Sequence, residues 1–328
     1  MDHVKILSRA WALLWRYRVL WLFGFLFALA GGGSSFPSAP SSSNSTSGGS
    51  SNGSVPSLPP SFTMDDNTVV AIIVGVVVVA LLLVVLLTIL RYVAETALIA
   101  GVDELENTGA HLTVRRGFRL GWSRQAWRLF LTEFVIYLIF GLAAILLVAL
   151  AASPLLLLLI NADAVHAIAV GAAGLFLLSA ILFLIVVALA LSLVLPYIQR
   201  RAVLGRQGVR AAFRQGLTLV RASLRDTGLM WLVLVAIGFL WAIVKIPIII
   251  LLVVMAVIVG GVPAGLVYLM SQSWVAAVVV GLPLFLIVLI PTATFIEGLF
   301  QVYNSSAWTL AYRQVTEQHS DLLPVNGS

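Results

Sequence analysis

The sequence predicts an all-α fold, a polytopic transmembrane helix bundle with about six spans. The main observations are compositional: 61% of the 328 residues are hydrophobic and only 10% are charged. Soluble domains carry roughly 25% charged residues, so this composition is typical of a protein embedded in a membrane. The apolar residues also fall in long runs separated by short basic segments, as expected for helices that cross a bilayer repeatedly.

A repeated unit divides the chain into three similar parts, each a basic amphipathic helix followed by two spans. A Val followed by a cation, with a second cation four residues after the first, occurs at Val4, Val114 and Val209. Amphipathic helices are therefore expected at 3–18, and on the cytoplasmic side at 110–128 and 200–226. Internal repeats of this kind are common in membrane folds. The whole chain, 1–328, is interpreted as one transmembrane domain.

The third amphipathic helix has the clearest pattern of apolar and basic residues. At 100° per residue its apolar stripe consists of Val209, Phe213, Leu217, Val220 and Leu224. Arginines lie on the opposite side, and a helix of this kind is typical of a lipid interface. The alternative is a helix packed on its own bundle. The arginines of the second and third helices that we predict to bind anionic lipid headgroups are Arg115, Arg119, Arg210, Arg214, Arg221 and Arg225.

The six apolar runs long enough to span are, in order, 11–30, 69–90, 129–152, 168–195, 229–260 and 275–300. The first requires a helix that begins near Trp11. Its alternative is a cleaved signal peptide ending at Ala30. We expect the span to be retained, because it completes the first of the three units. Residues 31–66 are rich in Gly, Ser and Pro and are predicted to form a disordered extracytoplasmic loop.

The fifth run is long for one span. Gly260 to Pro263 and Ser271 to Ser273 are interpreted as turn and loop. The alternative to six spans is seven, with 229–244 and 247–270 crossing separately.

Orientation follows from the cations. Six spans place all 19 Lys and Arg residues except Lys245 on one side, and the opposite loops hold Asp65, Asp66 and Asp163. Cytoplasmic segments carry the excess of cations. We therefore expect a multi-pass protein of the cell membrane with both termini in the cytoplasm.

Ionisable residues inside spans are candidates for function, and here they are Glu133, Lys245 and Glu297. For Glu133 we favour a salt bridge to Arg128 or to a neighbouring basic helix. Lys245 lies beside Pro247, and we expect it to snorkel toward the outer interface. Glu95, Glu133 and Glu297 are expected in one layer with the arginines, either as a polar cavity or as contacts between helices.

No catalytic, metal-binding or cofactor motif accompanies these residues. The chain has no cysteine, and its four histidines lack metal-ligand spacing. It also lacks the glycine-rich loops that bind phosphate or dinucleotides. Because the cations are confined to segments between spans, they indicate lipid headgroups rather than nucleic acid.

Three stretches resemble the glycerophosphoryl diester phosphodiesterase membrane-domain family of bacteria. They are WRYRVLWLFG at 15–24, RAVL at 201–204 running into GVRAAFRQG at 208–216, and TLAYR at 309–313. The resemblance covers most of the chain outside 31–66 and implies a shared membrane scaffold. In the named enzyme a separate soluble barrel performs hydrolysis with carboxylates and a metal, and no segment of this chain resembles that barrel.

Three classes of function are compatible with these patterns. The first is a non-enzymatic scaffold or partner subunit, contacting lipid headgroups and a membrane protein partner. The second is a transporter or lipid-handling protein, which needs polar groups converging inside the membrane. The third is an intramembrane enzyme, for which Glu133 with Glu297 is the pair to test. The sequence favours the first.

Overall fold

The structure, a computed structural model, describes residues 2–31, 66–109, 112–159, 163–205 and 208–319. These residues are helical almost throughout and contain no strand, so the predicted all-α class is confirmed. The elements are α1 (His3–Arg16), α2 (Val19–Leu29), α3 (Asp66–Thr108), α4 (Val114–Gly121), α5 (Arg124–Ala152), η1 (Ser153–Leu159), α6 (Asp163–Leu204), α7 (Val209–Ala222), α8 (Leu224–Ser271) and α9 (Trp274–Gln318). Apart from its ends, the predicted loop at 31–66 lies outside the described residues.

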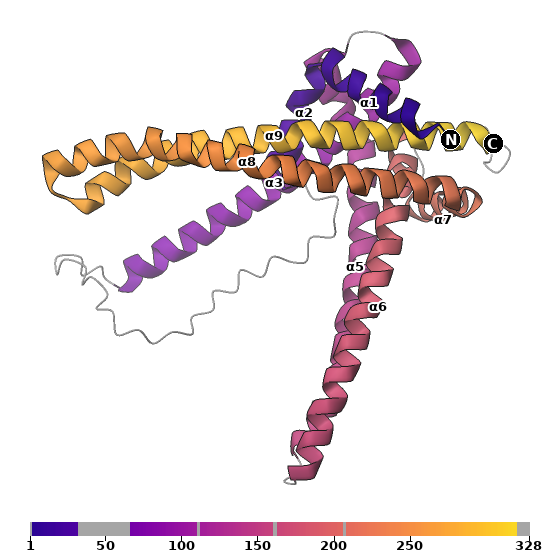
Figure 1. Cartoon of the computed structure of the whole chain (residues 1–328), viewed down its shortest axis with the longest axis horizontal. Helices are drawn as coiled ribbons and strands as arrows, with labels where there is room; N and C mark the ends of the chain where they lie inside the picture. The colour runs from indigo at the N-terminus through magenta and orange to yellow at the C-terminus, as the bar shows by residue number, and fades with distance from the viewer. Residues whose placement is uncertain (1, 32–65, 110–111, 160–162, 206–207, 320–328) are drawn as a thin grey trace.

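The predicted repeat appears as three units of a short helix and a helical hairpin: α1 with α2–α3, α4 with α5–α6, and α7 with α8–α9. In Figure 1 the α5–α6 hairpin, the α8–α9 hairpin and the first half of α3 diverge as three arms. The arms meet where α3, α6 and α9 end. We call this meeting place, with α1, α2, α4 and α7 packed around it, the hub.

The short helices close the three units into a ring. Each packs on the second hairpin helix of the preceding unit: α4 on α3, α7 on α6, and α1 on α9. Because α1 of the first unit packs on α9 of the last, the arrangement is cyclic. The ends of α3, α6 and α9 also contact one another, so the second helices of all three hairpins form the centre of the hub.

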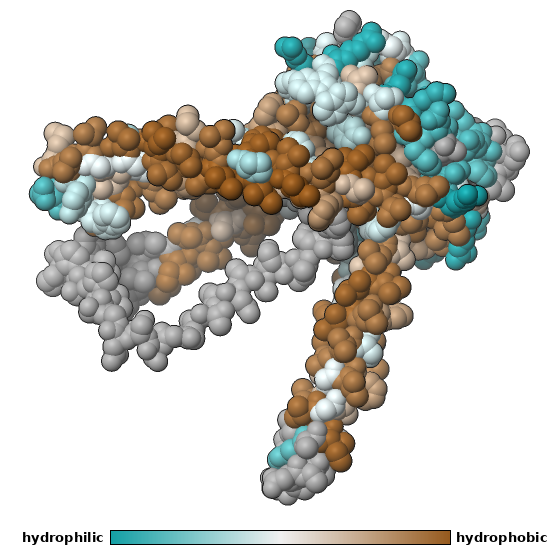
Figure 2. Space-filling view, viewed as in Figure 1, coloured by the Kyte–Doolittle hydropathy of each residue, from teal (hydrophilic) through white to brown (hydrophobic). Residues whose placement is uncertain are grey.

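Among the residues that the structure describes, five helices are long and apolar enough to cross a membrane, or six if the bent pair α1 and α2 is counted as one span. In the most apolar window of each of the five, at most 11% of the residues are buried within the protein. Figure 2 shows apolar residues along the arms and hydrophilic residues gathered over the hub. The arms therefore present the apolar surface that a lipid environment requires.

The expected continuous helix from Trp11 to Ala30 is wrong. The chain bends by 98° between Arg16 and Val19, and the indole of Trp21 donates to the Leu14 carbonyl across the bend at 2.7 Å. The bend allows α1 to pack on α9 while α2 packs between α3 and α9. With 11 residues, α2 is about 16 Å long and reaches only about halfway through an apolar core of about 30 Å.

The turn expected at Gly260 to Pro263 is also wrong, because α8 is one helix from Leu224 to Ser271. Gly260 supports close helix packing: a Cβ added there would lie 2.7 Å from the carbonyl oxygen of Gly281 on α9. Small residues allow two membrane helices to approach in this way. The predicted turn at 271–273 is present, with Gln272 in the left-handed region at φ 51°. The seven-span alternative needs a break within 229–270, and α8 has none.

Candidate functional site

The six arginines predicted to contact lipid are exposed, and none forms an ion pair with a described residue. They lie on α4 (Arg115, Arg119), on α7 (Arg210, Arg214, Arg221) and in the first turn of α8 (Arg225). The basic segment predicted at 200–226 is divided. Arg200 and Arg201 belong to the end of α6 and are buried, so the amphipathic helix begins at Val209. The segment predicted at 110–128 is likewise divided, between α4 and the start of α5.

The aromatic residues of α4 and α7 are exposed. The apolar stripe predicted along 209–224 is divided, because Phe213 and Leu224 are exposed whereas Val220, with its neighbour Leu219, is buried in the hub. Phe118 and Trp122 are 42% and 64% exposed, and Phe213 is 43% exposed. Small residues also pack against the hub. A Cβ added to Gly117 would lie 2.5 Å from the ring of Phe23, and one added to Gly216 would lie 2.9 Å from the Ile198 side chain.

The first unit repeats this arrangement on α1. Ala10 and Leu14 are buried, whereas Trp11 and Trp15, each the next residue along the chain, are 56% and 52% exposed. In all three units a buried residue is therefore followed by an exposed aromatic one. We call the exposed aromatic residues of the three short helices and their caps the aromatic stripe; they are Trp11, Trp15, Phe118, Trp122 and Phe213.

Glu133 on α5 lies in a polar cluster at the centre of the hub. Its fully buried carboxylate accepts from the Tyr92 hydroxyl at 3.2 Å, from Gln199 Nε2 at 2.6 Å and from Arg91 Nη2 at 3.5 Å. The salt bridge expected to Arg128 is instead made with Arg91 of α3. The carboxylate therefore joins α3, α5 and α6.

Arg200 extends this cluster to α9, a role that no motif in the sequence predicted. It is 4% exposed and donates to Gln199 Oε1 at 3.0 Å and to the Ser305 carbonyl at 3.4 Å. Buried Glu95 of α3 is close enough to interact electrostatically with both Glu133 and Arg200. The only local signal was the position of Arg200 just after the apolar run that ends at Pro196.

Lys245 and Glu297 form a separate ion pair between α8 and α9. Lys245 Nζ lies 2.9 Å from Glu297 Oε2, and Gln301 Nε2 donates to the other carboxylate oxygen at 3.1 Å. The expected common layer therefore holds for Glu95 and Glu133, whereas Glu297 has different partners. Lys245, expected to snorkel outward, is neutralised within its own hairpin.

The acidic end of α3 binds three other elements of the hub. Asp103 pairs with Arg313 of α9 at 3.0 Å, Glu104 with Arg116 of α4, and Glu106 with Arg9 of α1 at 2.9 Å. The acidic residues that follow the second apolar run thus hold two of the short helices and the last helix together.

The chain matches one family model over residues 8–322, described as a family of unknown function, DUF7544. It belongs to that family. A search of curated proteins gave no match, and a search of solved structures gave none either.

For a member of this family, the charges of the hub divide into two groups. Those buried inside it, and those at the end of α3, are mostly paired with groups of other helices, an arrangement that joins helices. The unpaired arginines lie outside, on α4 and α7, which carry part of the aromatic stripe, and in the first turn of α8. Chemically, this second group has the features of a surface that contacts an anionic, partly apolar phase. Among the described residues no group of three His, Asp or Glu could hold a metal ion.

Proposed function

We propose that this protein is a non-enzymatic membrane scaffold or partner subunit whose short helices bind anionic lipid headgroups. The observation that carries the proposal is the outward-facing aromatic stripe, which is repeated in all three units. In the second and third units it is accompanied by exposed arginines that form no ion pair with a described residue. In water, large exposed aromatic residues would lose the free energy of burial. At a lipid interface they enter the acyl boundary while arginines on the same helix meet headgroups.

The expected strength of this contact is substantial. A Lys or Arg near an anionic membrane surface contributes about 1 kcal/mol, and salt screens that contribution. The four arginines at 210, 214, 221 and 225 would together contribute several kcal/mol in this approximation. The apolar residues of α7 set the depth of this helix in the lipid interface, because these residues leave water.

The experiment is lipid retention by the whole protein. The chain is purified in a maltoside detergent, offered equal amounts of phosphatidylglycerol and phosphatidylcholine, and analysed by native mass spectrometry. The quadruple variant with Gln at 210, 214, 221 and 225 should lose its preference for phosphatidylglycerol. A matched variant with Lys at the same positions should keep it. Equal retention of both lipids by the unaltered chain contradicts the proposal.

A transport or lipid-handling role is the second candidate, and one observation favours it. The Lys245–Glu297 pair, 34% and 23% exposed at its side chains, borders a depression of about 410 Å³ also lined by Ala28 and Thr294. A charged pair facing a hollow between membrane helices is a reasonable site for a polar group inside the bilayer. If this role holds, Lys245→Met with Glu297→Leu should abolish transport into proteoliposomes while the protein stays folded.

We also propose that the scaffold is shared with the glycerophosphoryl diester phosphodiesterase membrane-domain family. The three stretches that resemble it form α7, the bend between α1 and α2, and the contact between the ends of α6 and α9. The bend lies within the first unit, whereas the other two positions lie where units join, and a shared scaffold would account for all three. A solved structure of that membrane domain with a different cyclic order of units would contradict this proposal.

A further inference from the structure

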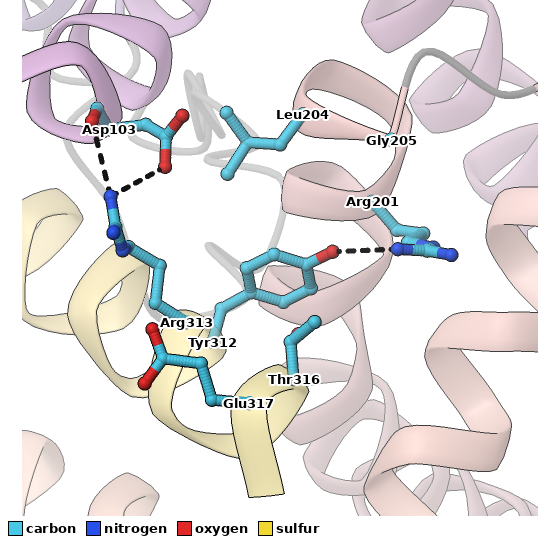
Figure 3. A pocket seen from close by; sticks show the side chains of 8 residues that line it. All are labelled: Asp103, Arg201, Leu204, Gly205, Tyr312, Arg313, Thr316 and Glu317. Atoms are coloured by element: carbon cyan, nitrogen blue, oxygen red, sulfur yellow. Dashed lines mark hydrogen bonds and ion pairs between the residues drawn. The ribbon is translucent and has the colours of Figure 1, made fainter. Parts of the chain in front are cut away.

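A depression of about 210 Å³ lies where the ends of α3, α6 and α9 meet (Figure 3). The polar residues that border it are Asp103, Arg201, Tyr312, Arg313, Thr316 and Glu317. It is separate from the aromatic stripe, which lies on the short helices. It is also separate from the Glu133 cluster, with which it shares no residue.

Arg201 is the buried cation of this site, and its partners are neutral. It is 5% exposed, and it donates from Nε to Gln215 Oε1 at 2.7 Å and from Nη1 to the Tyr312 hydroxyl at 3.4 Å. Within the described part of the chain, no carboxylate lies within ion-pair distance of it. Burying a charge without a counter-charge is costly. The site therefore contains a cation that is compensated only by dipoles.

Tyr312 connects that charge to the depression. Its oxygen accepts from Arg201, so its own O–H remains free to donate, and a described acceptor for it is lacking. Figure 3 shows the ring between Arg201 on one side and Arg313 on the other. A hydroxyl that already accepts from a guanidinium is a stronger donor, because hydrogen bonds in a chain polarise one another.

Two further groups offer donors to the same space. Arg313 uses Nη1 for the carbonyl and carboxylate of Asp103, at 3.2 and 3.0 Å, and keeps Nε and Nη2 for other acceptors. The Thr316 hydroxyl is buried and has no hydrogen-bond partner among the described residues. Donors on α9 without a described acceptor therefore line the depression, together with the buried cation Arg201 on α6.

We propose that this depression binds a phosphate group through the Tyr312 hydroxyl, the free edge of Arg313 and the Thr316 hydroxyl, with Arg201 supplying uncompensated charge. A phosphate offers several acceptor oxygens, and guanidinium groups match its geometry. The carboxylates of Asp103 and Glu317 also line the depression, and they repel a bound anion to different degrees. Asp103 is already paired with Arg313, whereas exposed Glu317 is not, so Glu317 limits the affinity. The phosphate is either free in solution or part of a lipid headgroup.

The experiment measures binding to the full chain, purified in maltoside detergent and phosphate-free buffer. One titration uses inorganic phosphate and the other uses short-chain phosphatidic acid. Native mass spectrometry and thermal shift follow binding in each. One bound molecule per chain is expected in at least one of the two titrations. Arg201→Gln and Tyr312→Phe should each weaken it about tenfold or more, and Glu317→Gln should strengthen it. Arg124→Gln, which removes an exposed cation at the start of α5 outside this depression, is the matched control and should leave it unchanged.

The two titrations identify the source of the phosphate and can overturn the proposal. Binding of inorganic phosphate assigns free phosphate, and binding of phosphatidic acid alone assigns a lipid headgroup. If neither ligand binds, the proposal is wrong. It is equally wrong if Tyr312→Phe, which keeps the ring and the fold, binds as tightly as the unaltered chain. The result is distinguishable from failure of the proposed function, because the arginines tested there are on α7 and α8 and not in this depression.

Discussion

At the scale of single residues, the hub is organised by charges that were brought together from distant positions. Glu133 has no charged partner on its own helix, and its contacts come from residues 91, 92 and 199. Inside a protein an ion pair of this kind adds little stability compared with apolar residues, but removing one partner leaves the other uncompensated. The cluster therefore holds α3, α5 and α6 in one relative position.

Replacing Glu133 with Ala is accordingly expected to destabilise the protein by about 3–5 kcal/mol, because Arg91 and Gln199 lose their common acceptor. Glu133→Gln keeps the shape and an acceptor oxygen and should cost less. Reversible unfolding in mixed detergent micelles would measure both. Glu317→Ala is the control: it removes an exposed carboxylate and should change stability by about 0.5 kcal/mol or less. Equal stability of the Ala variant and the unaltered chain would mean that the cluster does not hold the hub.

Close backbone contacts are the second feature at this scale. A Cβ added to Gly24 of α2 would lie 2.5 Å from the carbonyl oxygen of Gly298 on α9, and one added to Gly298 would lie 2.7 Å from the Phe25 nitrogen. The two helices therefore cross backbone to backbone. At such a crossing a single methyl group must move one of the helices.

Gly24→Ala should therefore destabilise the protein by about 1–3 kcal/mol, the usual cost of overpacking. Gly141→Ala on α5 is the matched control, since nothing lies within 4 Å of a Cβ added there. That variant should be neutral or stabilising by up to about 1 kcal/mol, because Gly is a poor helix former. The same unfolding assay compares them, and a Gly24→Ala variant as stable as Gly141→Ala would argue against the crossing.

At the scale of elements, each short helix has two faces with different roles. Hydropathy predicts the large apolar stripe, because large apolar residues dominate the signal. It does not predict which face packs, because Gly117 and Gly216 carry almost no hydropathic signal. Their role depends on Phe23 and Ile198, which lie on other helices. The sequence thus predicted these helices and the arginines on them. Only the tertiary structure reveals which face of each helix packs against the hub.

The position of α7 at a lipid interface predicts different membrane depths for its exposed apolar residues and its exposed arginines. The chain has no cysteine, so a single spin label can be placed by Phe213→Cys or, one residue on, by Arg214→Cys. In vesicles containing phosphatidylglycerol, the label at 213 should be more accessible to oxygen, which concentrates in the bilayer. The label at 214 should be more accessible to a water-soluble nickel complex. Identical accessibility at both positions would place α7 away from the interface.

At the scale of the whole molecule, three units form a ring around the ends of α3, α6 and α9. The order of elements was predictable, because the basic segments and apolar runs repeat along the chain. The cyclic packing was not predictable, because the contact of α1 with α9 joins the two ends of the sequence and has no local signal. The partners of Glu133 and Lys245 were missed for the same reason. Each partner lies at least 41 positions away in the chain.

The distribution of charge over this ring predicts the orientation of the protein. Every described Lys and Arg except Lys245 lies in or near the hub segments, and the described tips of the arms hold none. By the positive-inside rule the hub and both termini should be cytoplasmic. Single cysteines introduced by Ser50→Cys and Arg206→Cys test this with a membrane-impermeant maleimide on intact cells. Only the label at 50 should react before lysis, and both should react after it. Reaction of both positions in intact cells would place residues 50 and 206 on the same side and would require a different number of crossings.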